Sequence, residues 1–142
     1  TIKGQMTLVT TSRRSTPVTR AIAKDFAFAT GGRYLPRGKH GLREISCEHD
    51  LFIVFEQQKS DILMTVYQEG EPCLMRLVKS HETGVREGLL IKGIKTSDRE
   101  IGMILDAGEC PVIYTDDLED GLFLSFDGPQ RRHITLALEK IR

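Results

Sequence analysis

The segment Leu8–Arg20, LVTTSRRSTPVTR, decides the N-terminal part of the fold. It continues an expected strand over Met6–Thr10, because β-branched residues favour extended structure. After a polar turn, Thr16 and Pro17 predict a helix start, with threonine as the N-cap and proline in the first turn. Apolar residues at helical spacing continue to the Gly31–Gly32 pair, which ends this predicted helix over residues 17–30.

The turn inside this segment is a candidate phosphate site. Ser12, Arg13 and Arg14 lie next to the predicted helix N-terminus. Such an N-terminus exposes backbone N–H groups and the positive end of the helix dipole, and guanidinium groups match phosphate oxygens. An exposed turn with two solvated arginines explains the same residues equally well, so the turn alone leaves both interpretations open.

A second basic segment follows the helix, Gly31–Arg43, GGRYLPRGKHGLR. Its cations are interleaved with Tyr34, a short expected strand over Arg33–Leu35 and several glycines. Cations that follow an RNA backbone, with an aromatic ring for base stacking, are common in RNA-binding proteins. The glycine spacing does not fit a P-loop, and His40 stands where a P-loop has Ser or Thr. The alternative is a solvated basic loop. The two segments together supply the candidate RNA-binding residues: Ser12, Arg13, Arg14, Arg20, Arg33, Tyr34, Arg37, Lys39 and Arg43.

A net charge of zero hides a strong asymmetry along the 142 residues. Residues 1–45 carry nine basic side chains against two acidic ones, a net charge of +7, and the rest carries 11 against 18, a net charge of −7. Such a division between parts of a chain is typical of proteins that contact nucleic acids or membranes.

The remaining chain predicts alternating strands with two short helices. One helix is expected over Leu42–His49. A capping box at Ser97–Glu100 predicts a second helix, which ends near Gly108. The expected strands are Leu51–Glu56, Ile62–Tyr67, Cys73–Lys79, Leu89–Ile94, Pro111–Thr115, Leu122–Phe126 and His133–Glu139.

An internal repeat organises these elements. Phe52–Lys79 matches Val112–Glu139 in its order of strands and turns. This alignment also places the helix at Leu42–His49 opposite the helix before Gly108. We therefore expect an α+β fold with two similar halves, each a small, mostly antiparallel sheet with one or two helices. Residues 1–142 would form a single domain, with halves at 1–82 and 88–142, a polar boundary at 80–88, and no second copy of the first helix.

Catalytic and metal chemistry are not expected. The four histidines and three cysteines lack the spacing of a zinc site, and no nucleophile or cofactor motif is present. Asp116–Asp120 is expected to be a solubilising hairpin turn. Every apolar run is shorter than a membrane span and no signal peptide is visible. We expect a monomeric, cytoplasmic protein with no cofactor.

Three features resemble the signature of the Brix domain: LVTTSRR, the pair Pro17 and Arg20, and GRYLPRGKHGLREI at Gly32–Ile45. The segments are most similar to short archaeal Brix proteins, which are similar to the Brix subunit of the eukaryotic small-subunit processome. The resemblance implies a fold of two halves, each like the anticodon-binding domain of class IIa aminoacyl-tRNA synthetases.

The same resemblance implies a function. It predicts a non-catalytic, rRNA-binding ribosome biogenesis factor that acts in pre-rRNA processing and small-subunit assembly. Its partners would be rRNA or pre-rRNA, together with ribosomal or assembly-factor proteins, and in a eukaryote it would be nucleolar. The alternative is a protein-interaction module that binds a ribosomal or assembly-factor protein without RNA.

Overall fold

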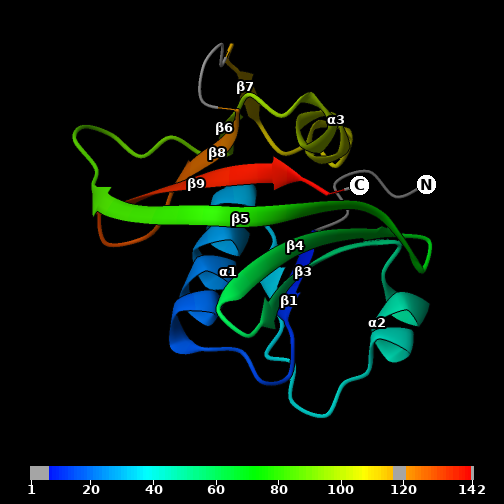
Figure 1. Ribbon diagram of the computed structural model, residues 1–142. Helices are drawn as coiled ribbons and strands as arrows, with labels where there is room; N and C mark the ends of the chain where they lie inside the picture. The colour runs from blue at the N-terminus through cyan, green and yellow to red at the C-terminus, as the bar shows by residue number, and fades with distance from the viewer. Residues whose placement is uncertain (1–6, 117–120, 142) are drawn as a thin grey trace.

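The computed structural model describes residues 7–116 and 121–141 of the chain. Within them, nine strands form one curled, mixed sheet in the order β2-β1-β3-β4-β5-β9-β8-β6-β7 (Figure 1). The strands are β1 (Leu8–Thr11), β2 (Arg33–Tyr34), β3 (Leu51–Gln58), β4 (Asp61–Gln68), β5 (Glu71–Val85), β6 (Ile94–Thr96), β7 (Val112–Tyr114), β8 (Leu122–Asp127) and β9 (Arg132–Lys140). The helices are α1 (Pro17–Thr30), α2 (Leu42–Glu48) and α3 (Arg99–Ala107).

Helix α1 has the predicted bounds and caps. The Thr16 side chain accepts the backbone N–H of Thr19, and Gly31 ends the helix in the left-handed region with φ 72°. The buried face of α1 centres on Phe26, whose ring meets Phe55 of β3 edge-on at 5.5 Å and Phe126 of β8 at 5.4 Å. Since these strands lie in different parts of the sheet, α1 packs inside the curl and joins both parts through one core.

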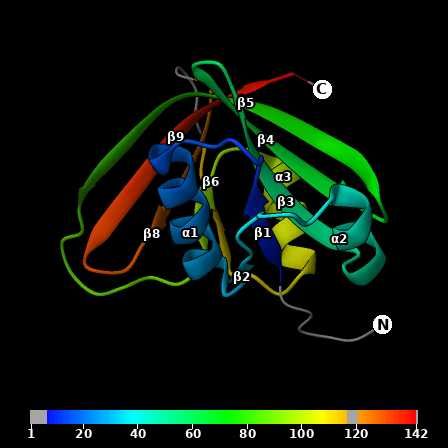
Figure 2. The ribbon, with the colours of Figure 1, turned by 90° about the horizontal axis from the view of Figure 1, so that it is seen from below.

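Helices α1 and α2 cover opposite faces of β1 and β3 (Figure 2). Val9 and Ile53 belong to the core on the α1 side, whereas their neighbours Leu8 and Phe52 pack with Ile45 of α2. This division follows from strand geometry, because successive side chains point to opposite faces. All four strand residues are fully buried, so a helix is needed on each side.

The internal repeat holds for the hairpins β4–β5 and β8–β9, but not for the alignment of β3 with β7 or for the helices. Strand β6 pairs in parallel with the edge strand β7, and α3 connects them, as α1 connects the parallel pair β1 and β2. Helix α3 therefore corresponds to α1, and the alignment of α3 with α2 was wrong. The second set of strands lacks a counterpart of α2 and β3, because β8 pairs directly with β6.

Two strand predictions were also wrong. Strand β5 continues beyond Lys79 to Val85, so residues 80–85 are not an irregular boundary but pair with β9. The pairing with β9 explains the extension, because residues 80–85 pair with β9 on one edge while their polar side chains stay exposed to solvent. In the expected strand Leu89–Ile94 only Ile94 is in a strand, the first residue of β6.

The start of α3 differs from the predicted capping box. Asp98, not Ser97, is the N-cap, and its carboxylate accepts the N–H groups of Glu100 and Ile101. The Ser97 hydroxyl instead accepts the backbone N–H of Phe123 in β8. Asp98 is a stronger N-cap than Ser97 because its negative charge also interacts favourably with the helix dipole.

A buried ion pair connects β5 to α3. Arg76 is fully buried, and its Nε lies 2.6 Å from Oδ2 of Asp98. Arg76 also donates to Glu100 at 2.8 Å and to the carbonyl of Met75 at 3.0 Å. Lys140 of β9 reaches the same Glu100 carboxylate at 3.0 Å. The carboxylate of Asp98 therefore both caps α3 and compensates a charge inside the protein.

Candidate nucleic-acid interface

The strand connections at β1 create a switch point in the sheet. Strand β1 pairs in parallel with β2 on one side and β3 on the other, and the connecting helices α1 and α2 leave on opposite faces. Ligands of open α/β sheets bind in the crevice at the carboxyl ends of strands where the connections diverge in this way. Here that end of β1 is followed by the Ser-Arg-Arg turn, so the topology places predicted site residues at the expected position.

This crevice, hereafter the switch-point crevice, measures about 540 Å³. The turn after β1 contributes Ser12 and Arg13, the β2–α2 loop contributes Arg37, and the end of β3 contributes Glu56. The remaining lining residues are Gly41, Leu42, Gln57 and Gln58. Two arginines face one carboxylate, and neither arginine forms an ion pair among the residues described. The crevice thus carries a net positive charge.

Arg37 contributes a positive charge to the crevice and also fixes the position of the loop that lines it. Its Nη1 donates to the carbonyl of Thr11 at 3.0 Å, and its Nε donates to the carbonyl of His40 at 2.7 Å. These bonds hold the β2–α2 loop against the end of β1. Burial, and then repulsion by Arg13, lower the pKa of the Arg37 guanidinium, because two like charges share the same space.

Ser12 has a structural role at the edge of the crevice. Its hydroxyl accepts the backbone N–H of Gln57 at 2.8 Å, and its own N–H donates to the carbonyl of Phe55. Ser12 therefore extends the pairing of β1 with β3 past the last strand residue. This contact fixes the start of the turn from which Arg13 projects, and the Arg13 guanidinium lies near Gly41 of the facing loop.

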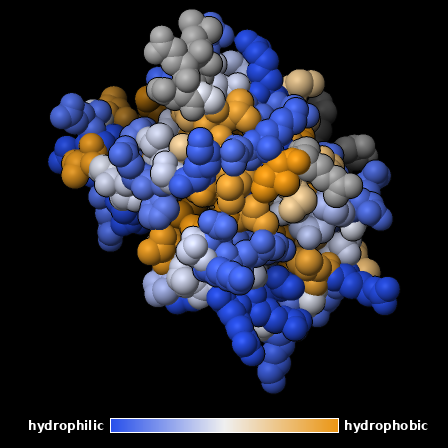
Figure 3. All heavy atoms as spheres, viewed as in Figure 1, coloured by the Kyte–Doolittle hydropathy of each residue, from blue (hydrophilic) through white to orange (hydrophobic). Residues whose placement is uncertain are grey.

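The exposed cations Arg14, Lys39 and Arg43 lie around the crevice rather than in it. None of them forms an ion pair within the described residues, although Glu44 nearby bonds to His40 at 2.8 Å. Figure 3 shows hydrophilic side chains gathered at the lower end of the molecule, where Figure 1 places the connections after β1 and β2. The segments that carry these three cations therefore lie at one hydrophilic end of the molecule.

Three predicted residues lie on another surface, beside α1. Tyr34 is half-buried against the core, and the Lys24 ammonium lies 5.6 Å from its ring centre. Arg33 is exposed on the edge strand β2. Arg20 points along α1 and donates to the carbonyl of Ser15. The structure therefore divides the nine predicted residues between the crevice and its rim on one side and the surface of α1 on the other.

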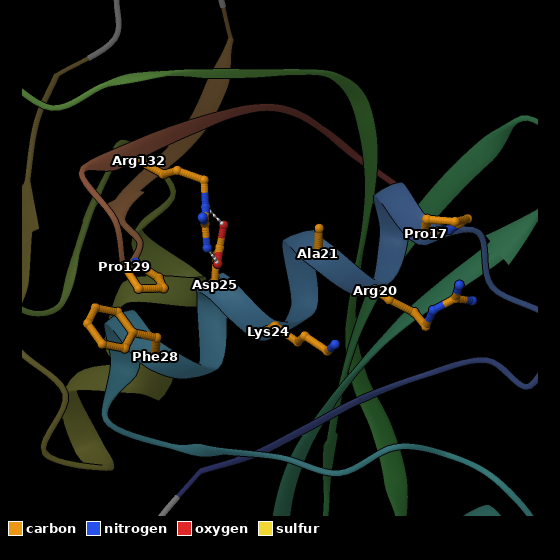
Figure 4. Close-up of a pocket in the computed structure, with 8 residues that line it drawn as sticks. All are labelled: Pro17, Arg20, Ala21, Lys24, Asp25, Phe28, Pro129 and Arg132. Carbon is orange, nitrogen blue, oxygen red and sulfur yellow. Dashed lines mark hydrogen bonds and ion pairs between the residues drawn. The ribbon is translucent and has the colours of Figure 1, made fainter.

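A second cavity, hereafter the α1 groove, runs along the outer side of α1 and measures about 580 Å³. Its lining residues are Pro17, Arg20, Ala21, Lys24, Asp25, Phe28, Pro129 and Arg132 (Figure 4). Among these, only Arg20 was a predicted site residue. Lys24 could have been found from its position four residues after Arg20 on the same helix face. Arg132 comes from the opposite end of the chain, and no local pattern indicates its position.

Across residues 7–116 and 121–141, no three His, Cys, Asp or Glu side chains come together as metal ligands. The predicted acidic turn Asp116–Asp120 lies outside the described residues, except for Asp116. Among the described helices, none combines the length and the apolar character needed to span a lipid bilayer.

Comparisons with known proteins give matches at the level of structure. No protein-family model and no curated protein matches the sequence. The crystal structure of Mil, an archaeal Imp4-like protein, matches with a TM-score of 0.62 and 19% sequence identity, over 92% of this chain and 95% of Mil. The chain has the fold of an Imp4-like protein. The Imp4-like fold confirms, at the level of architecture, the resemblance to Brix proteins.

Proposed function

We propose that this chain is a non-catalytic RNA-binding factor of ribosome biogenesis that holds rRNA or pre-rRNA at the switch-point crevice. The observation that carries the proposal is the set of cations at this end of the sheet without ion-pair partners in the described residues. The Imp4-like fold agrees with the resemblance of the sequence to Brix proteins. Because Brix proteins are associated with pre-rRNA, the two similarities together support a role in ribosome biogenesis.

Arg13 and Arg37 would bind a phosphate group together in the crevice. Two guanidinium groups that face the same space repel each other, and a bound phosphate removes that repulsion. The N-terminus of α1 adds little, because Thr16 already accepts the N–H of Thr19 and Pro17 has no N–H to donate. Binding therefore depends on the arginine side chains more than on the helix dipole.

The exposed cations around the crevice would contact the neighbouring phosphates of a folded RNA. Arg14, Lys39 and Arg43 point outward from three different segments, the turn after β1, the β2–α2 loop and α2. Contacts of this kind recognise backbone geometry rather than base sequence. The protein would hold an RNA junction in place during small-subunit assembly, in the cytoplasm of an archaeon or the nucleolus of a eukaryote.

The test is a salt series of binding to small-subunit rRNA fragments. The variant Arg13→Ala/Lys39→Ala removes two exposed cations at the crevice that make no ion pair in the described residues. The control Lys79→Ala/Lys95→Ala removes two exposed cations from β5 and β6. We expect the crevice variant to reduce the slope of log affinity against log salt by about 1.5, and the control to leave the slope unchanged.

Two results would contradict the proposal. One is wild-type protein that binds none of the fragments. The other is an equal loss of affinity and slope in both variants, because the positive end of the sheet would then have no special part in binding. Thermal unfolding of each variant shows whether a loss of affinity reflects a loss of folded protein.

A protein-interaction role has separate support in the end of β5 and the segment that connects it to β6. Val85, Leu89 and Ile91 are 75%, 90% and 60% exposed, which is unusual for apolar side chains so close in sequence. This segment would bind a ribosomal or assembly-factor protein. The variant Leu89→Ser/Ile91→Ser would weaken co-purification with that partner and leave the affinity for RNA unchanged; weaker RNA binding would assign the segment to the RNA surface instead.

A further inference from the structure

The α1 groove lies between the two parts of the sheet, away from the switch-point crevice. Its floor is apolar and comes from Ala21 and Phe28 of α1 together with Pro129 of the β8–β9 turn. Its rim on the α1 side carries Arg20 and Lys24, as Figure 4 shows. The groove thus combines a flat apolar floor with a cationic edge.

Asp25 of α1 and Arg132 of β9 form an electrically neutral pair in the lining of the groove. Asp25 is 5% exposed and accepts two hydrogen bonds from Arg132, from Nε at 3.0 Å and from Nη2 at 2.8 Å. The third nitrogen of this guanidinium donates to Gln130 at 2.9 Å. The carboxylate is therefore already compensated, and it does not neutralise the cations on the rim.

The cations of the rim have no carboxylate partner among the residues described. Arg20 donates to a carbonyl and Lys24 lies over a tyrosine ring; Lys92, which is not a lining residue, lies over the ring of Phe28 with its Nζ 4.1 Å from the ring centre. None of the three forms an ion pair. The groove is therefore suited to a ligand that is both anionic and partly apolar.

The spacing along α1 specifies the ligand further. Arg20, Lys24 and Phe28 follow one another at intervals of four residues, which corresponds to about 6 Å of helix rise for each step. This step is close to the separation of neighbouring phosphates in an extended single strand. A groove of about 580 Å³ admits one unstacked base but not a double helix.

We propose that the α1 groove binds one unpaired nucleotide of a single-stranded RNA segment. The base lies on Phe28 and Pro129, and Lys24 and Arg20 contact successive phosphates on one side of the base. This inference rests on the proposed function, because the single strand is the continuation of an RNA held at the switch-point crevice. Base stacking on an aromatic ring beside cations is the usual basis of sequence-tolerant binding to single strands.

The test compares an rRNA hairpin that binds the wild type with the same hairpin carrying a single-stranded oligouridine tail on either end. The groove variant is Lys24→Ala/Phe28→Leu, which keeps an apolar side chain in the floor. The control is Lys79→Ala, which removes one exposed cation from β5. Binding is measured by fluorescence anisotropy in a salt series, and circular dichroism checks that each variant is folded.

We expect the tail to increase wild-type affinity about tenfold, and the groove variant to lose this gain while its affinity for the blunt hairpin stays unchanged. The salt slope for the tailed RNA should fall by about 0.7 in the groove variant and not in the control. Lys24→Ala alone, which leaves the floor intact, should lose part of the gain. A 4-thiouridine in the tail should cross-link to the α1 peptide that contains Phe28.

The failure of this inference can be separated from the failure of the proposed function. A blunt hairpin that binds, with a tail gain that is absent or equal in wild type and groove variant, overturns the assignment of the α1 groove and leaves the crevice intact. A wild type that binds neither RNA overturns both.

Discussion

Replacement of Asp98 by alanine tests the buried contact between β5 and α3. The substitution removes the N-cap of α3, which costs about 1 kcal/mol. It also removes the carboxylate 2.6 Å from the fully buried Arg76, which keeps the more exposed Glu100 and a main-chain carbonyl as partners. The loss of a partner in a buried pair costs about 3 kcal/mol. We expect the free energy of unfolding to fall by about 4 kcal/mol, a large part of the stability of a typical domain.

Urea unfolding followed by circular dichroism measures this change. Two variants separate its causes. Asp98→Asn keeps an oxygen that can cap the helix, so its loss should be smaller than that of Asp98→Ala. Arg76→Met/Asp98→Ala removes both charges and should be more stable than Asp98→Ala alone. A loss below about 1 kcal/mol in Asp98→Ala would refute the reasoning, because the cap alone accounts for that amount.

Three further predictions concern pH, thiol chemistry and backbone packing. Burial would raise the pKa of the Asp127 carboxyl, but the hydrogen bonds from His133 and the Ile91 N–H, together with the nearby positive charges, outweigh burial and lower this pKa, so the stability it contributes is present above about pH 4 and is lost as the pH falls further; Asp127→Asn should flatten the acid side of a plot of unfolding free energy against pH, and an unchanged plot would contradict this. Burial raises the pKa of the Cys110 thiol to about 11, so mass spectrometry should find the two exposed cysteines alkylated at pH 8 and Cys110 alkylated only after unfolding, whereas rapid labelling in the native protein would show that it is accessible. A Cβ on Gly32 would lie 2.2 Å from the backbone oxygen of the residue before β1, so Gly32→Ala should lower stability by about 2 kcal/mol, while Gly84→Ala, with open space around it, should have little effect; equal melting temperatures would refute the packing argument.

Much of the fold was predictable because local signals agreed with the tertiary structure. Helix α1 has a threonine cap, an initial proline and a terminal glycine, and the structure uses all three. The hairpin of β3 and β4 has apolar residues on both faces, and both faces are buried. The capping box predicted Ser97 as the N-cap of α3, whereas the structure uses Asp98, whose carboxylate also pairs with Arg76, more than twenty residues earlier in the chain.

The pairing of the strands was not predictable from these patterns. The parallel neighbours of β1 come from segments that follow two different helices, and periodicity contains no information about which strands become neighbours. The basic residues could be found because charge is visible in the sequence. Their division between the switch-point crevice and the surface of α1 depends on strand pairing, so it could not be predicted. Arg132 reaches Asp25 across more than a hundred residues.

The position of β9 has a consequence for biosynthesis. It is the last strand in chain order, yet it lies in the middle of the sheet between β5 and β8. Val85 pairs with Arg132 and Arg76 with Lys140, so the 15-residue strand β5 has an unpaired edge until the final strand leaves the ribosome. Unpaired strand edges promote aggregation. The nascent chain therefore carries an open template for intermolecular pairing from the completion of β5 until β9 is made, and premature termination before β9 would make that exposure permanent.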